Sequence, residues 1–383
     1  MVYQNKVSFH QRSKIAYLES RILNISPIFS GSYRHSDVEF LLKPVTIEFT
    51  SIEEKEALIQ SGKMHYSDML SQEPEPTQHH LDLFNKAYTI GAKRLAKEVM
   101  MLAVTLAKEY GNTPIVLASL VRAGVPLGVM LQRALKMMGK ESYHYGISII
   151  RDRGIDETAL AVIEERHGTE GIVWVDGWTG KGAITNELTK ALNGRAGYPA
   201  QPRLVVLADP CGCAWMSATD DDWLIPFGIM GAPVSGMISR SLYSDEGFHH
   251  CMVCNHLSEY ECGLSLANAV EQCCQEIELS DVPPIDIKVR DSIKAKEWER
   301  SKAIMTLLAE RYDISSSNRI KPGIAEATRA VLRRVPDHVL VRSINDPDVS
   351  LLVYLAKEKG VEITEVGDLI GQYRAVTIIK KVL

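Results

Sequence analysis

One stretch, residues 172–185 (IVWVDGWTGKGAIT), combines groups that could bind a phosphorylated sugar. Its Gly-Lys pair suggests an ATP-binding P-loop, but that motif needs Gly where Val175 stands and Ser or Thr where Gly182 stands. An acid after an apolar run, then a Thr/Gly loop and a helix start, fit another geometry. Asp176 could bind sugar hydroxyls while backbone amides of the loop and the helix N-terminus bind a monophosphate. The loop residues are Thr179, Gly180, Lys181 and Gly182.

The seven cysteines offer a second kind of chemistry, because they cluster between residues 211 and 274. An odd number of cysteines in a reducing compartment argues against a disulfide framework and leaves buried thiols, a metal site or a reactive thiol. A zinc site would combine a C-x-C with a C-x₂-C, and its candidate ligands are Cys211, Cys213, Cys251 and Cys254, with His250, His256 or Cys262. A nucleophile would be Cys213 or Cys251, activated by His249 or His250. Plain buried thiols beside a lid are the third interpretation.

The elements that must position these residues alternate between strands and helices. Apolar runs at 115–118, 143–150, 171–176 and 203–208 predict strands, and periodic apolar residues predict helices at 81–111, 126–139 and 183–194. Such alternation indicates βαβ units and therefore an α/β fold with a parallel sheet. Ligands of such sheets bind at the carboxyl ends of the strands, where the Gly-rich loops lie.

Two breaks divide the chain into three parts. Pro-containing DVPPID ends the first pattern near residue 280, and DISSSNRIKPG follows a charged helical stretch. The predicted domains are 1–280 with an N-terminal extension and a Cys-containing lid, a helical connector at 281–314, and a small α/β domain at 315–383. That last part has 11 Lys and Arg against 8 Asp and Glu, whereas the whole chain has a net charge of −5. A basic tail on an acidic body weakly indicates a nucleic-acid partner.

The sequence does not favour a membrane-spanning or a secreted protein. No apolar run is long enough to span a bilayer, and the N-terminus has no apolar signal core. We therefore expect a cytoplasmic protein without a membrane partner.

The strand, acid and Thr/Gly loop at 172–185 resemble the type I phosphoribosyltransferases. Asp176 matches the family's first acidic residue, and Thr179–Gly182 matches the loop that holds the 5′-phosphate of phosphoribosyl pyrophosphate (PRPP). Gly177 departs from the family, which usually has a second acid there. The resemblance implies a phosphorylated ribose substrate bound with Mg²⁺.

Two further loops match in the same order along the chain. Residues 118–128 (ASLVRAGVPLG) resemble the pyrophosphate loop, with Arg122 as the base and Ser119, Ala123 and Gly124 lining the turn. Arg151 and Arg153 stand where the family has a mobile basic loop. Residues 222–243 would form part of a lid, and the acceptor pocket would take His65, Tyr66 and Asp68. Taken singly, each loop could instead be a plain turn between a strand and a helix, and Arg122 could be a surface or salt-bridge residue.

The C-terminal segment resembles the L7Ae/Pelota RNA-binding domain. That resemblance implies that Gly323, Glu326 and Arg329, with Lys321 beside them, contact RNA, and the spacing of three places the last two on one helix face. Ala325 replaces the family's usual Asn. The alternative is a surface salt bridge between Glu326 and Arg329.

Nearly the whole chain resembles one bacterial family linked to tellurite-resistance (Ter) stress operons. In that family a phosphoribosyltransferase-like domain is fused to a Pelota domain, and the family also carries the label cysteine protease StiP. Three functions follow as alternatives: a ribonucleotide-directed transferase with an RNA-binding module, a cysteine hydrolase using the Cys211–Cys254 cluster, or a nucleotide sensor that binds RNA. The acceptor, the RNA and the oligomeric state, for which a homo-oligomer is one option, stay open.

Overall fold

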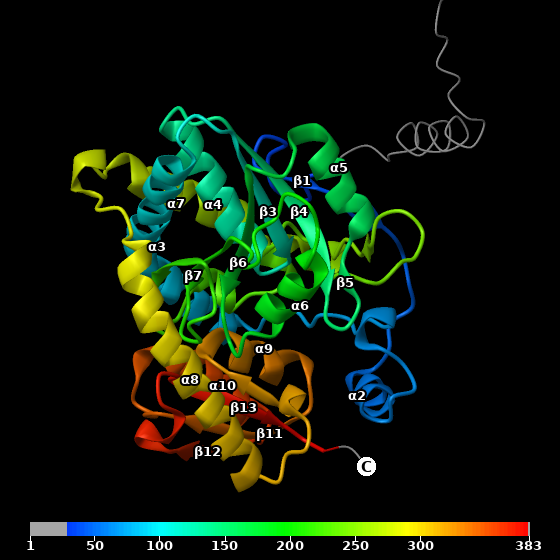
Figure 1. Cartoon of the computed structure of the whole chain (residues 1–383). Coiled ribbons are helices and arrows are strands. Elements are labelled where there is room, and N and C mark those ends of the chain that lie inside the picture. The colour runs from blue at the N-terminus through cyan, green and yellow to red at the C-terminus, as the bar shows by residue number, and fades with distance from the viewer. Residues whose placement is uncertain (1–28, 382–383) are drawn as a thin grey trace, which may run out of the picture.

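The large sheet is built from the predicted apolar runs. The computed structural model describes residues 29–381 (Figure 1). The central strands are almost wholly buried, as is typical of a parallel sheet covered on both faces: β3 (Ile115–Val121), β4 (Ser142–Ile150), β6 (Ile172–Trp178) and β7 (Leu204–Ala208). The order is β1-β4-β3-β6-β7-β8 with every neighbouring pair parallel, which confirms the predicted α/β fold. The sequence pattern misses the short strands β1 (Glu39–Phe40), β5 (Gly154–Ile155) and β8 (Met216–Thr219).

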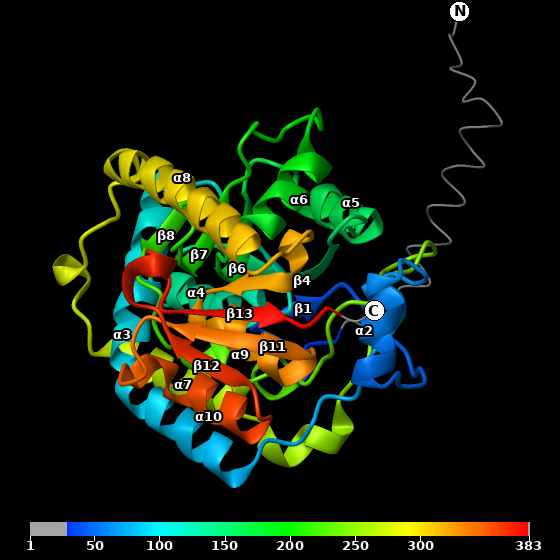
Figure 2. The ribbon, with the colours of Figure 1, turned by 90° about the horizontal axis from the view of Figure 1, so that it is seen from below.

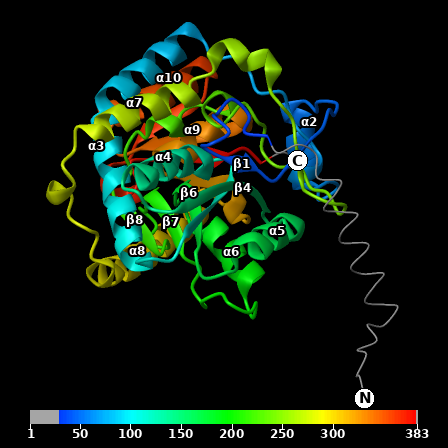
Figure 3. The same ribbon diagram turned by 90° about the horizontal axis from the view of Figure 1, so that it is seen from above.

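Helices cover both faces of this sheet (Figure 3). Successive strand residues point to opposite faces, so Leu117 and Val173 join one apolar core while Val116 and Trp174 join another. The first core packs under α3 (Gln78–Tyr110), α4 (Gly124–Met137) and α7 (Gly263–Gln275). The second packs under α5 (Glu157–His167) and α6 (Ala183–Leu192).

A smaller domain follows the long connector helix α8 (Ile287–Arg311) (Figure 2). Its sheet has the order β10-β13-β11-β12. The strands are β10 (Ile320–Pro322), β11 (Pro336–Val341), β12 (Glu362–Glu365) and β13 (Ala375–Ile379). One face packs on α9 (Ile324–Arg333) and α10 (Ser350–Glu358), and the other on Ile304 and Leu308 of α8. The predicted alternation of helices and strands here is therefore correct.

Segments with little regular structure close the space between the two domains. They comprise residues 41–76, which include β2 (Lys43–Pro44), α2 (Ile52–Gln60) and a short 3₁₀ turn at Tyr66–Asp68, and residues 220–262, which include β9 (His250–Cys251). β2 and β9 pair with each other, so the two segments are joined. None of the helices in residues 29–381 has the length and apolar character that a membrane span needs.

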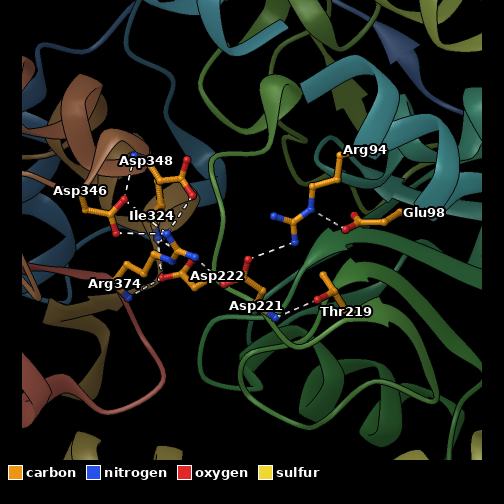
Figure 4. A network of polar contacts seen from close by, with 9 residues as sticks. All are labelled: Arg94, Glu98, Thr219, Asp221, Asp222, Ile324, Asp346, Asp348 and Arg374. Carbon is orange, nitrogen blue, oxygen red and sulfur yellow. Dashed lines mark hydrogen bonds and ion pairs between the residues drawn. The ribbon is translucent and has the colours of Figure 1, made fainter. Parts of the chain in front are cut away.

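The two domains share a core and a polar clamp (Figure 4). Ile225 and Phe227 of the larger domain belong to the same apolar cluster as Ile324 and Val331 of α9. The guanidinium of Arg374 pairs with Asp221, Asp346 and Asp348, and Asp221 also pairs with Arg94. The Asp222 carboxylate accepts hydrogen bonds from the backbone amides of Ile324 and Arg374. These contacts hold α9 against the larger domain.

Candidate functional site

Three predicted loops lie side by side because β4, β3 and β6 are neighbours in the sheet. Arg122 follows the carboxyl end of β3, Arg151 follows β4, and Thr179 follows β6. Carboxyl ends of parallel strands meet at one edge of the sheet, so the loops share that edge. The peptide bond between Val121 and Arg122 is cis.

A cavity of about 610 Å³ lies at this edge, between the sheet and the C-terminal domain. Arg122 and Arg151 of the larger domain line it together with α2, the segments around residues 65–74 and 239–256, and α9. Eight lining residues are cationic: Lys55, Arg122, Arg151, Arg240, Lys321, Arg329, Arg333 and Arg334. Only three lining residues are acidic: Glu73, Asp152 and Glu326.

Positive charge in the cavity exceeds the local counter-charge, and pKa values reflect this. Burial, followed by repulsion from Arg240 and Arg334, lowers the pKa of Lys55 to about 8. Burial and repulsion from Arg122 lower the pKa of Arg329 to about 10. The pKa of Arg240 also falls to about 10, chiefly through burial. An anion entering the cavity would relieve this repulsion.

Several guanidinium donors of the cavity lack partners. Nε of Arg122, Nε of Arg151, and both Nε and Nη2 of Arg329 are buried without a hydrogen-bond acceptor in the described part of the chain. Leaving such donors unpaired costs about 1–3 kcal/mol each. Because native proteins pair nearly all buried polar atoms, these four donors are available to the oxygens of an acceptor-rich ligand.

The phosphate-loop candidates do not line the cavity, because the C-terminal domain covers them. The hydroxyl of Tyr373 donates to the Gly180 carbonyl at 2.6 Å, and Lys181 Nζ donates to the Ile320 and Ser317 carbonyls. Gly182 lies against Trp298. Thr179 Oγ1 donates to Asp209 at 2.6 Å. The expectation of an open phosphate loop is therefore not met in this closed arrangement.

The structure explains the missing second acid at Gly177. A Cβ there would lie 3.0 Å from the Ala123 carbonyl oxygen and 3.1 Å from the Phe227 ring, so a side chain at this position would be tightly confined. Burial raises the pKa of its neighbour Asp176 to about 7, and Arg329 and Glu326 act on Asp176 electrostatically. Glu326 of α9 reaches the loop, since a Cβ on Gly180 would lie 2.1 Å from its Oε2. A second carboxylate thus comes from the other domain.

The remaining phosphoribosyl candidates divide between structural and lining roles. Ser119 is fully buried and hydrogen-bonds His144 Nε2 at 2.7 Å, and a Cβ on Gly124 would meet the Val175 carbonyl oxygen at 2.1 Å. Ser119, Ala123 and Gly124 therefore hold the turn against the sheet instead of facing the cavity. Arg153 pairs with Asp68 and stacks over Tyr243, and neither Arg153 nor Asp68 lines the cavity. His65 and Tyr66 do line it.

The cysteines do not form the predicted zinc site. Cys211 and Cys213 lie near Ser301 and Thr185, while Cys251 and Cys254 lie beside the cavity segments. Within residues 29–381, no group of three or more His, Cys, Asp or Glu side chains is arranged to hold a metal ion. Cys211 and Cys213 lie in the loop after β7, whereas Cys251 lies in β9 and Cys254 follows it.

The predicted thiol nucleophiles also lack their bases. In the described structure no cysteine sulfur hydrogen-bonds a histidine; Cys213 instead contacts the Thr185 hydroxyl at 3.2 Å. Cys251, next to His250 in β9, is fully buried, and burial raises its pKa to about 12. Cys254 is the one cysteine among the lining residues of this cavity, and burial raises its pKa as well.

Sequence reasoning missed four residues that complete the cavity: Lys55, Glu73, Arg333 and Arg334. It named His256 only as a possible zinc ligand and included Arg240 only in the expected lid segment 222–243. A signal existed for the α9 residues, since Glu326, Arg329 and Arg333 recur at helical spacing and so share one face. Glu73, in the Pro-rich segment SQEPEP, carries no local signal.

Glu73 supplies a test of this electrostatic environment. Arg122 and Arg333 outweigh the effect of burial and hold the pKa of Glu73 at about 2. A depressed carboxyl pKa stabilises the fold above the ordinary value of 4.5, and this contribution disappears as the pH falls toward 2. We expect the stability advantage of the wild type over Glu73→Gln to shrink by about 3 kcal/mol across that window, measured by urea unfolding. The exposed Glu75→Gln is the control, and a pH-independent difference for Glu73→Gln would contradict the assignment.

Two comparisons with known proteins bear on identity. Residues 31–271 match the family described as "Tellurite-like stress resistance cysteine protease StiP", and residues 299–381 match "PELOTA RNA binding domain". A protein of Acinetobacter baylyi named "Cysteine protease StiP" is 48% identical over 367 residues, covering 92% of this chain and 94% of the relative.

A solved structure shows only a weak likeness. A hypoxanthine phosphoribosyltransferase of Trypanosoma cruzi with bound IMP is 16% identical and covers 42% of this chain and 86% of its own, at a TM-score of 0.27. A TM-score this low does not establish a shared fold or a shared activity. The family match over most of the larger domain and the similarity over nearly the full length agree, and the chain belongs to the StiP family.

Proposed function

We propose that the cavity binds a ribose compound carrying a pyrophosphate group, with PRPP as the reference ligand, and that the protein acts at the ribose anomeric carbon. The observation that carries the proposal is the set of unpartnered guanidinium donors in a cavity with eight cationic and three acidic residues. Arg122 and Arg151 follow adjacent strands at the edge of the sheet where ligands of α/β folds bind. Asp176 lies within β6, near the carboxyl end of the strand, and is not among the residues that line the cavity.

The chemistry is a substitution at carbon. The C1–O bond of the ribose breaks, and its electron pair leaves with the pyrophosphate oxygen while an acceptor nitrogen or water forms the new bond to C1 and releases its proton. Arg122 and Arg151 would stabilise the negative charge that develops on the leaving group, as preorganised cations do in other transfer reactions. Glu326, which lines the cavity, would face the cationic ribose.

Mg²⁺ usually accompanies such ligands, but the residues present do not build a cage for it. Over the described ranges no cluster of three or more potential metal ligands exists. Of the lining carboxylates, Glu73 is paired with Arg122 and Glu326 with Lys321. We therefore assign charge neutralisation to the arginines and derive no step through a metal.

Calorimetry on the full chain tests the proposal directly. PRPP should bind more tightly than AMP, which lacks the pyrophosphate group, with affinity that falls as salt rises because the contacts are ionic. Binding of AMP and PRPP with equal affinity would remove the assignment of the pyrophosphate group to the cavity.

A cysteine hydrolase is the second candidate, favoured by the name of the relative and by the position of Cys254 in the cavity wall. The thiol would need a base to become a thiolate. His256 also lines the cavity, but its Nε2 bonds the Glu73 carbonyl at 2.9 Å, and no hydrogen bond joins it to Cys254 in residues 29–381. In this arrangement His256 Nε2 contacts the Glu73 carbonyl instead of the thiol.

Cys254→Ser separates the two candidates. We expect PRPP affinity to change less than about threefold, since a thiol and a hydroxyl contribute similarly to an ionic site. We also expect no peptidase activity in either protein when a denatured protein is the substrate. Proteolysis that is lost in Cys254→Ser but kept in the control Cys213→Ser would establish the hydrolase instead.

RNA is proposed as a partner of the C-terminal domain because residues 299–381 match an RNA-binding family. Lys321, Gly323 and Glu326 face the larger domain: Lys321 is 7% exposed and pairs with Glu326, and Gly323 lies beside Asp222. Arg329 stacks on Trp178 at 4.5 Å. RNA contact through these four residues would require the domains to separate.

A further inference from the structure

Helix α9 presents two chemically different faces. Ile324, Ala327 and Val331 are buried in the apolar core. Glu326, Arg329 and Arg333 line the cavity on the other side of the helix. The charged face is therefore directed at the ligand space of the larger domain, and it brings two arginines to a cavity that Arg122, the residue after β3, also lines.

These arginines gather around one carboxylate. Glu73 Oε2 lies 2.5 Å from Arg122 Nη2 and 3.8 Å from Arg333 Nη2. Glu73 Oε1 accepts a hydrogen bond from the Ala232 amide at 2.8 Å. A Cβ on Gly231 would lie 1.4 Å from Glu73 Oε1, so glycine is needed for the carboxylate to fit. A Pro-rich segment of irregular backbone thus places an anion among cations from both domains.

One carboxylate does not satisfy this set. Arg122 is 7% exposed and keeps an unpartnered Nε, and Arg329 keeps unpartnered Nε and Nη2 atoms. Arg333 has a single ion pair, the long one to Glu73, among the described residues. Two or more further acceptor oxygens would pair these donors, and an anion would also balance the positive charge of the arginines.

We propose that Arg122, Arg329 and Arg333 form an anion site shared by the two domains and that its ligand is a pyrophosphate-type group. The Glu73 carboxylate occupies this anion site until the ligand displaces it. The proposal deepens the proposed function and rests on it for the ribose part of the ligand. While the two domains are docked, the charged face of α9 therefore binds a small molecule.

The shape of the site favours a small anion over RNA. A volume of about 610 Å³ is that of a pocket for a nucleotide-sized ligand. The unpartnered donors are buried, whereas RNA-binding residues must reach phosphates and bases on an extended polymer. Bidentate guanidinium contacts match phosphate oxygens closely.

Calorimetry with sodium pyrophosphate on the full-length chain tests the proposal. We expect the double variant Arg329→Gln/Arg333→Gln to lose at least about 30-fold in affinity, since two charge-assisted contacts are removed. Glu73→Gln should bind about tenfold more tightly because the internal competitor loses its charge. The matched control, Lys302→Ala/Lys357→Ala, removes two exposed cations outside the cavity and should stay within threefold of the wild type. Circular dichroism verifies that each variant is folded.

Several outcomes would overturn the proposal. One is pyrophosphate affinity in the arginine double variant within threefold of the wild type; another is weaker binding by Glu73→Gln. A third is salt-sensitive RNA binding that depends on Arg329 and Arg333 but that pyrophosphate does not displace, which would assign the face to RNA.

PRPP titrations of the same proteins separate this inference from the proposed function. If pyrophosphate binding depends on the arginines but PRPP binds no better than AMP, the anion site stands and the ribose chemistry fails. If PRPP binds and reacts equally well in the double variant, the proposed function stands and the α9 site fails.

Discussion

Arg122→Ala should lower the free energy of unfolding by about 3–5 kcal/mol and reduce PRPP affinity at least about 100-fold. The guanidinium donates to the Ile238 carbonyl at 3.0 Å and to Glu73 at 2.5 Å. Without it, Glu73 keeps only the long contact to Arg333 and the Ala232 amide. A buried charge that loses its partner is costly, because water does not replace the lost contact. Urea unfolding and calorimetry measure the two effects.

A double-mutant cycle tests the cause. Arg122→Ala/Glu73→Gln should be more stable than Arg122→Ala alone, since the uncompensated carboxylate is gone. Arg122→Lys keeps a charge but loses one of the two contacts, so it provides a folded variant for binding if the alanine variant unfolds. Arg153→Ala, which breaks a half-exposed ion pair with Asp68 outside the cavity, should cost less than about 1 kcal/mol. Equal losses for Arg122 and Arg153 would contradict the buried-pair explanation.

Asp222→Ala should lower the free energy of unfolding by about 2–5 kcal/mol and loosen the C-terminal domain. The Asp222 carboxylate accepts from the amides of Ile324 and Arg374, at 2.9 and 2.8 Å for the shortest contacts, and so caps α9 from the other domain. Removing it leaves two buried donors unpaired, each worth about 1–3 kcal/mol. Hydrogen exchange should show faster exchange in α9 than in β3.

The contribution of Asp222 to stability changes with pH in the opposite direction to that of Glu73. Burial raises the pKa of Asp222 to about 6, so the ionised form is disfavoured in the fold and its stability contribution falls as the pH rises from about 4 to above 6. Asp222→Asn keeps one acceptor oxygen and cannot ionise. We expect the stability of the wild type relative to Asp222→Asn to increase between pH 7 and pH 5. An unchanged difference, or normal protection of α9 in Asp222→Ala, would show that the cap is not what holds the domain.

The sheet and its loops follow from local patterns. Runs such as Ile115–Val121 and Ile172–Trp178 are apolar without alternation, and this composition predicts buried parallel strands. A parallel sheet places all strand carboxyl ends at one edge, so a meeting of the Arg122, Arg151 and Thr179 loops could be predicted from the strands alone. The amphipathic character of α9 is likewise a property of spacing.

The cysteines show where sequence proximity misleads. Cys211 lies in the loop after β7 and Cys251 lies in β9, and a short interval along the chain does not bring them into one metal site. Glu73 shows the converse, since nothing near it in sequence signals that Gly231 leaves room for its carboxylate beside Arg122. Contacts of this kind join residues with no shared periodicity.

The sequence by itself determined the α/β fold, the Gly-containing loops at the strand ends, and a C-terminal domain with a charged helix face. Only the tertiary structure decided that this face points into the cavity, that the Thr179–Gly182 loop is covered, and that Glu73 occupies a cluster of arginines. The physical reason is range: helical spacing and strand burial are set by neighbours along the chain, whereas the docking of α9 depends on contacts such as Asp222 with Ile324, 102 residues apart. Such contacts arise from the packing of whole domains, and no local pattern records them.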